Sequence, residues 1–110
     1  MSQDIPESDW KVLRQIHPVA LERYCQKVLK EIAQVAADTT EGAHPRYRKI
    51  YGLVQERDEM IRAVFSGLRR STGIMQLIMM DAQGLVTEEE IGRFTQSTRD
   101  VIARVAADRE

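Results

Sequence analysis

The sequence predicts an all-α domain, elongated and built from three to four helices with one long central helix. Apolar residues recur at helical spacing in three segments of the 110-residue chain, and no segment alternates apolar and polar residues as a strand does. The longest stripe, at spacings of three and four, consists of Tyr47, Ile50, Val54, Arg57, Ile61, Val64, Leu68, Ser71, Met75, Ile78 and Ala82. Such a stripe is typical of a helix that packs against other helices.

The first helix is expected over residues 8–37. Residues 1–7 show no periodicity and are expected to form a flexible leader, whereas Ser8 is a suitable N-cap residue. Pro18 falls inside the helical pattern, where it removes a backbone donor. Because the apolar pattern continues in phase across Pro18, we expect a kink there rather than a break.

The second helix is expected to be the long central one. Residues 38–44 have the composition of a turn and Pro45 suits a first helical position. The stripe then continues to about Gln83, which corresponds to roughly 57 Å of helix. Gly67 and Gly73 weaken this helix and are the places where it can bend.

Residues 74–80 are apolar on nearly every side of a helix. This pattern predicts that other helices surround the segment, so Leu77 and Ile78 are expected in the core. A chain of this length has room for one hydrophobic core. Residues 8–110 are therefore expected to form a single helical domain.

The C-terminal part of the chain carries two helix-start signals. Thr87 and Glu90 have the spacing of a capping box, and Gly84 fits the position just after a helix end. Gly92 and Thr95 are expected to divide the last helical segment into a short piece and a longer final helix, with Thr95 as the second N-cap.

Composition limits the kinds of protein that the chain can be. The formal net charge is −1 and the charged residues are interspersed, which argues against strong non-specific attraction to nucleic acid or anionic membranes. The N-terminus lacks the features of a secretory signal, and the apolar run from Gly73 to Met80 is too short to span a bilayer. Cys25 is the only cysteine. We therefore expect a cytoplasmic protein.

No recognisable catalytic arrangement is present in the sequence. It lacks a nucleophile with an adjacent base, paired carboxylates in a known cleft motif and a glycine-rich phosphate loop. Residues 81–90 resemble the second half of a calcium-binding EF-hand loop, but Met79 then occupies the position of the first carboxylate ligand. We therefore expect neither enzymatic activity nor a cofactor or metal.

The leading functional hypothesis is a non-enzymatic helical protein–protein interaction or regulatory module, most simply a homodimer. Two shorter segments cannot cover a helix of the expected length, so part of its stripe would be left for a partner. Arg57 is expected to set the helix register, the alternative being a buried polar ligand. The candidate interface consists of Tyr47, Ile50, Val54, Arg57 and Ile61.

The alternative hypothesis is a nucleic-acid-binding protein that uses the basic start of the long helix. A helix N-terminus favours anions, and the candidate anion contacts there are His44, Arg46, Arg48 and Lys49. A solvated first turn, in which Tyr47 packs within the apolar stripe, is the favoured interpretation of the same residues. The small size of the patch and the near-neutral charge make nucleic acid the less favoured partner.

Four strings in the chain resemble a group of small bacterial helical proteins that carry no assigned function. They are Ser8-Asp9-Trp10-Lys11, Leu21-Glu22-Arg23-Tyr24-Cys25, Arg69-Arg70-Ser71-Thr72 and Gly84-Leu85-Val86-Thr87-Glu88-Glu89-Glu90. The resemblance extends over nearly the whole chain and implies a bacterial cytosolic origin. It implies no activity, cofactor or catalytic residue.

Overall fold

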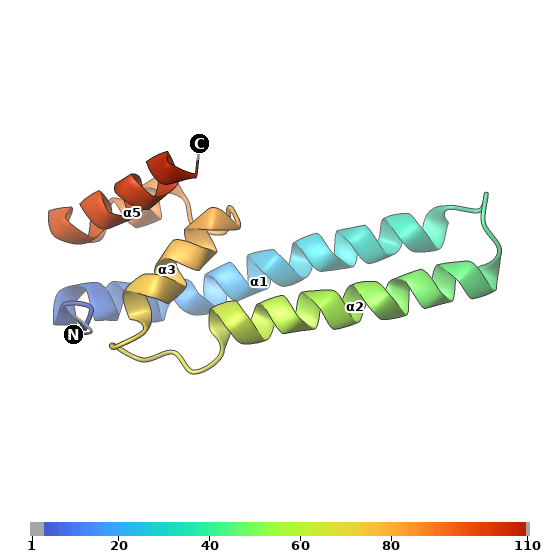
Figure 1. Ribbon diagram of the computed structural model, residues 1–110, viewed down its shortest axis with the longest axis horizontal. Coiled ribbons are helices and arrows are strands. Elements are labelled where there is room, and N and C mark those ends of the chain that lie inside the picture. The colour runs from blue at the N-terminus through green and yellow to red at the C-terminus, as the bar shows by residue number, and fades with distance from the viewer. Residues whose placement is uncertain (1–3, 110) are drawn as a thin grey trace.

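The computed structural model describes residues 4–109 as five α-helices in an elongated arrangement of 52 × 26 × 24 Å (Figure 1). In chain order the helices are α1 (Glu7–Ala37), α2 (Ala43–Phe65), α3 (Gly73–Ala82), α4 (Glu88–Ile91) and α5 (Gln96–Asp108). The described residues contain no strand. The all-α class and the elongated shape predicted from the sequence are therefore confirmed.

The longest helix is the first one. α1 contains 31 residues, a length of about 46 Å, and runs through Pro18 without ending there. Pro18 and Arg14 are exposed, so the carbonyl group that loses its donor at the proline can be solvated. The helix expected over residues 8–37 is confirmed to within one residue.

The predicted long helix from Pro45 to Gln83 is wrong, because the chain turns at the end of α2 and starts a new helix at α3. Ser66 is extended, with φ −78° and ψ 149°, and Gly67 has a φ of +64°, which glycine adopts at little cost and an α-helix does not contain. The turn allows α3 to pack against α1, α2 and α5. A continuous helix would have carried the apolar residues 74–80 away from these neighbours.

Two side chains from other helices donate hydrogen bonds to carbonyl groups at the end of α2. The buried amide of Gln76 donates to the carbonyl oxygens of Val64 (3.2 Å) and Ser66 (3.1 Å). Nε2 of His17 donates to the carbonyl oxygen of Phe65 (2.9 Å). Carbonyl groups at a helix end lack partners within their own helix, so these contacts stabilise the turn between α2 and α3.

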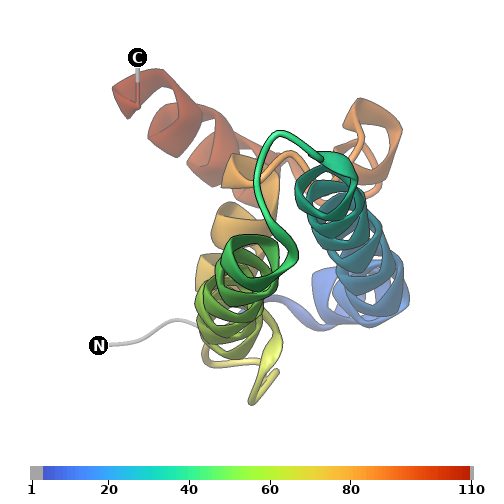
Figure 2. The ribbon, with the colours of Figure 1, turned by 90° about the vertical axis from the view of Figure 1, so that its right-hand side faces the viewer.

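The buried core lies at one end of the molecule, which we call the base (residues 4–24 and 64–109). There α3, α4 and α5 lie on one side of the pair formed by α1 and α2 (Figures 1 and 2). The buried apolar residues are Ile5, Leu13, Ile16, Ala20, Tyr24, Val64, Phe65, Leu77, Met80, Leu85, Phe94 and Ile102. All of them belong to the base.

The segment 74–80 is only partly enclosed. Leu77 is fully buried, as expected, but Ile78 is half-buried and Met75 is 60% exposed. The expectation that helices surround this segment on every side is therefore wrong, because α3 packs at the edge of the base.

The N-terminal segment is attached to the base. Ile5, which we expected within a flexible leader over residues 1–7, is fully buried. Its backbone N–H donates to the carbonyl oxygen of Arg70 (3.0 Å), and the guanidinium of Arg70 donates to the carbonyl oxygen of Ile5 (3.1 Å). The description of a leader is therefore corrected for residue 5, while residues 1–3 lie outside the described part of the chain.

The predicted C-terminal signals are present in the structure. The hydroxyl of Thr87 accepts from the backbone N–H of Glu90 (3.1 Å), and the Glu90 carboxylate accepts from the backbone N–H of Thr87 (2.9 Å), which completes the capping box. Thr95 occupies the N-cap position of α5, but its hydroxyl donates to Asp9 (2.7 Å) instead of capping the helix. The expected division of this segment is confirmed.

Candidate interaction surface on the helical arm

The distal parts of α1 and α2 form an arm (residues 25–63) that projects from the base (Figure 1). The structure describes every residue of the arm, and none of them is buried. Its inward-facing apolar residues are only half-buried: Val28, Ile32, Val35, Ile50, Leu53 and Ile61. Two helices thus cover each other on one side and leave their remaining sides open.

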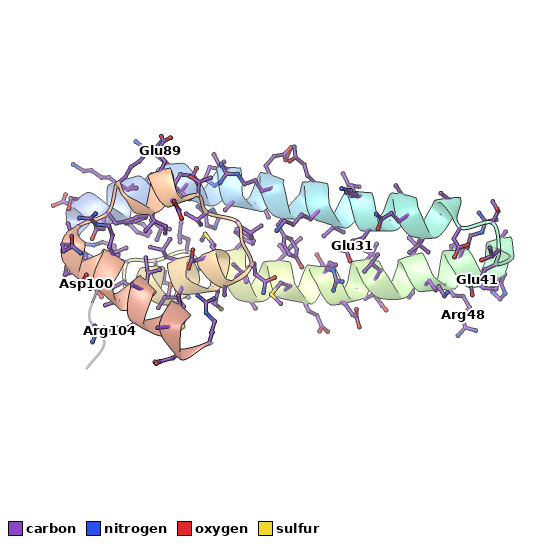
Figure 3. The ribbon with its side chains drawn as sticks, turned by 90° about the horizontal axis from the view of Figure 1, so that it is seen from above. Glu31, Glu41, Arg48, Glu89, Asp100 and Arg104 are labelled. Carbon is purple, nitrogen blue, oxygen red and sulfur yellow. The ribbon has the colours of Figure 1, made fainter. Side chains whose placement is uncertain are left out.

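An ion pair joins the two helices near the middle of the arm. The guanidinium of Arg57 donates through Nε and a terminal nitrogen to the two carboxylate oxygens of Glu31, at 3.1 and 2.9 Å. Figure 3 shows Glu31 between α1 and α2. These hydrogen bonds lower the pKa of Glu31 and raise that of Arg57. The pair links α1 to α2 near the middle of the arm.

One side of the arm is polar. A groove of about 590 Å³ lies between the helices there, and its lining includes Glu31, Gln34, Lys49 and Glu56. Arg23 and Lys27 extend the same stripe of α1 towards the base, where they donate to the carbonyl oxygens of Leu85 (2.9 Å) and Gln83 (3.1 Å). The segment between α3 and α4 therefore lies on the same side of α1 as the polar groove.

The opposite side, which we call the apolar face, carries few polar groups. A groove of about 250 Å³ between the helices is lined mainly by apolar side chains, and Tyr47 and Tyr51 line a neighbouring hollow on α2. We define the apolar face as Cys25, Leu29, Ile32, Tyr47, Tyr51, Val54 and Ile61. Leu29 is 64% exposed and Tyr51 is 60% exposed. Large apolar side chains grouped in this way are typical of an interaction surface.

The structure divides the predicted interface residues into two groups. Ile50, Arg57 and Ile61 are half-buried, and Arg57 is paired with Glu31. Tyr47 and Val54 are exposed, at 67% and 45%. The predicted stripe therefore lies partly inside the arm, and only its outer edge is open to a partner.

The predicted anion contacts are also divided. Arg46 donates to the carbonyl oxygen of Ala36 (2.6 Å) at the end of α1, and Lys49 forms an ion pair with Glu41. His44 and Arg48 have no hydrogen-bond or ion-pair partner among residues 4–109, and they lie beside the two tyrosines around the hollow on α2. Figure 3 shows Arg48 near the far end of α2, turned away from α1.

Sequence reasoning missed the contribution of α1 to the apolar face. Cys25, Leu29, Ile32 and Ala36 follow each other at spacings of four, three and four, so they form a second stripe on one side of this helix. Only the alignment of α1 with α2 shows that Leu29 and Val54 line one groove.

Two further observations concern residues 4–109 as a whole. No helix in this part of the chain combines the length and the apolarity needed to cross a bilayer. Within the same range, no three His, Cys, Asp or Glu side chains lie close enough together to hold a metal ion.

Comparisons of the chain with protein-family models, with curated proteins and with solved structures found no match. The resemblance to bacterial proteins without an assigned function thus stays a prediction. The function of the arm has to be inferred from its geometry.

Proposed function

We propose that this protein is a non-enzymatic helical interaction module, and that the apolar face of the arm binds an amphipathic helical surface of a protein partner. The observation that carries the proposal is the joint exposure of Leu29, Tyr51 and Val54 on a part of the fold that has no buried residue. Covering apolar surface yields about 25 cal/mol for each Å² removed from water. A partner helix that covers the apolar face would therefore also stabilise the arm.

The composition of the face supports a protein partner. Tyrosine and arginine are enriched where protein interfaces have their largest energetic contributions, and here Tyr47, Tyr51 and Arg48 are grouped on one helix. Two charged residues, Arg57 and Asp58, line the groove on the apolar face, whereas six line the polar groove on the opposite side of the arm. An amphipathic helix that lies in a shallow groove between two helices is an established mode of recognition.

The proposal can be tested with a photo-crosslinking amino acid placed at Tyr51 in the cells that produce the protein. Gln34 is the matched control, because it lines the polar groove of the same arm. We expect a protein adduct from position 51 and none from position 34. The proposal is wrong if neither position gives an adduct, or if both positions crosslink equally.

Nucleic-acid binding through residues 44–49 is the weaker candidate. Two of the four predicted contacts, Arg46 and Lys49, already have partners within the arm. The two remaining side chains, His44 and Arg48, are too few for a phosphate-binding surface of useful affinity, since non-specific binding depends on many such contacts.

A further inference from the structure

We infer that the hollow on α2 receives an aspartate or glutamate side chain from a helix of the partner protein. The hollow is lined by His44, Tyr47, Arg48, Tyr51 and Gly52. The inference rests on the proposed function, because it names the chemistry that the partner presents to this part of the arm. It is carried by the hydrogen-bond donors around the hollow and by the glycine among its lining residues.

The polar side chains around the hollow are suited to an anionic acceptor. The hollow has a volume of about 440 Å³, and its polar groups are a guanidinium, two tyrosine hydroxyls and an imidazole. All four side chains are exposed, and none has a hydrogen-bond or ion-pair partner among residues 4–109. A carboxylate offers two oxygens that accept such hydrogen bonds, and it carries the charge opposite to that of Arg48. A carboxylate therefore fits the hollow better than a cationic group does.

The acidic groups near Arg48 are engaged elsewhere. Arg48 also lines the polar groove, whose carboxylates belong to Glu31, Asp38, Glu41 and Glu56. Arg57 pairs with two of these carboxylates, at 2.9 and 3.7 Å, and Lys49 pairs with a third. The fourth, Asp38, accepts from the backbone N–H of Thr40 (3.1 Å). The charge of Arg48 thus has no counter-ion within the described part of the chain.

The first half of α2 has an excess of positive charge. Between Ala43 and Gln55 the charged residues are Arg46, Arg48 and Lys49, and no acidic residue occurs there. Arg46 donates to an uncharged acceptor, the carbonyl oxygen of Ala36 (2.6 Å). This half of the helix therefore complements an acidic residue on a partner.

Gly52 favours the close approach of another helix. Glycine in the interior of a helix is destabilising relative to alanine, and nothing within this chain requires it here, because a Cβ at this position would meet no atom within 4 Å. The missing side chain exposes the backbone of α2 one turn after Arg48. A partner helix that crosses α2 at Gly52 can therefore bring its carboxylate within reach of Arg48.

The inference can be tested with a phage-displayed library of amphipathic helical peptides, in which an apolar stripe is fixed and the positions beside it are randomised. Peptides would be selected on the purified full-length protein and on Arg48→Gln. We expect Asp or Glu to be enriched beside the stripe on the unmodified protein and not on the variant. The matched control is Arg104→Gln, which removes the same charge from the exposed side of α5 in the base and should leave the enrichment unchanged (Figure 3).

The affinity of one selected peptide then measures the contact. In fluorescence anisotropy, Arg48→Gln and replacement of the acidic residue of the peptide by Gln should each weaken binding about tenfold. The two changes together should weaken binding no more than either one alone, because they remove the same contact.

A second variant, Gly52→Ala, separates close approach from stability. The added Cβ lies in open space in the isolated chain, so the melting temperature should rise. The same peptide should nevertheless bind about tenfold more weakly, because the methyl group holds the partner helix away.

The outcomes separate this inference from the proposed function. Selected peptides without an acidic preference overturn the inference and leave the interaction module intact, as does a Gly52→Ala variant that binds with unchanged affinity. A dimer of the unmodified chain at tens of micromolar that excludes the peptides assigns the face to a second copy and overturns the inference. A salt-sensitive shift of short DNA that is lost in Arg48→Gln assigns the hollow to phosphate groups and overturns it as well. If no peptide is selected, the inference is wrong, whereas the crosslink from Tyr51 decides the proposed function independently.

Discussion

Helix α1 runs through both the base and the arm, yet it is covered to a different extent in the two regions. In the base, Leu13, Ile16 and Ala20 of α1 are at most 1% exposed, because α3 and the segments after it add a further layer (Figure 2). In the arm, α1 and α2 cover only each other and no residue is buried. A stripe of apolar residues therefore does not by itself produce a core. The number of layers around it decides how much of the stripe leaves water.

Truncation of one leucine in each region should give the largest contrast. Leu77 in the base is fully buried, so Leu77→Ala should lower the free energy of unfolding by about 2–5 kcal/mol through lost contacts and a cavity. Leu29 in the arm is 64% exposed, and Leu29→Ala should cost less than about 1 kcal/mol at concentrations where the chain is monomeric. Urea unfolding of both variants measures the difference. Equal losses would mean that the arm is covered in the isolated chain.

The second contrast concerns a buried carboxylate in the base. Asp9 is 1% exposed and accepts hydrogen bonds from the backbone N–H of Thr95 (2.8 Å) and from the hydroxyls of Thr95 and Thr98 (2.7 Å each). Asp9→Ala would leave three donors without this acceptor and should cost about 2–3 kcal/mol in chemical denaturation.

The matched control for Asp9 is Glu7, which is exposed in the same first turn of α1. Glu7→Ala loses only a favourable interaction with the helix dipole and should cost less than about 1 kcal/mol. If the two substitutions cost the same, Asp9 contributes through the dipole alone and does not attach α5 to α1.

A third contrast compares one ion pair in the base with one in the arm. In the base, the guanidinium of Arg23 donates to both oxygens of Glu90 (2.6 and 3.1 Å), and this holds the pKa of that carboxyl below its usual value. Glu90 has a side chain that is 10% exposed, whereas Glu31 in the arm is 40% exposed. The pair in the base is therefore less screened by solvent.

This difference predicts how stability depends on pH. A carboxyl group whose pKa is lowered by folding adds stability above its unfolded pKa and loses it as the pH falls through its folded pKa. Glu90→Gln should therefore cost about 1–2 kcal/mol at neutral pH, and the cost should shrink in acid. Glu31→Gln should cost less than about 0.5 kcal/mol. Urea titrations at several pH values test this, and a larger effect at Glu31 would contradict it.

The same comparison explains what the sequence could predict. The bounds of the first helix, the capping box at Thr87 and the division after Gly92 depend on nearby residues, and all three are confirmed. The end of α2 depends on Gln76 and His17, which approach it only in the folded chain. Periodicity therefore carried the predicted helix past this point, where a glycine with positive φ ends it.

The candidate interface was predicted in part for a similar reason. The stripe on α2 indicated which residues meet another helix, but it did not show that α1 of the same chain covers Ile50 and Ile61. Nor did it show that Glu31 binds Arg57. The exposed part of the face depends on how two helices are aligned, and this alignment is set by contacts between residues far apart in the sequence.

The smallest effect is expected for nucleic-acid binding at the far end of the arm, where α2 begins. We expect no shift of short DNA or RNA by the protein at physiological salt. Only His44 and Arg48 of the four predicted contacts lack partners among residues 4–109, and the formal net charge is −1. Arg46→Gln should instead weaken the contact between the start of α2 and the end of α1, because Arg46 donates to the carbonyl oxygen of Ala36. A salt-sensitive shift that disappears in Arg48→Gln but survives in Arg46→Gln would show that this end of the arm binds phosphate through Arg48. The apolar face would then be only one of two binding surfaces on the arm, and the contrast between base and arm would be one of function as well as packing.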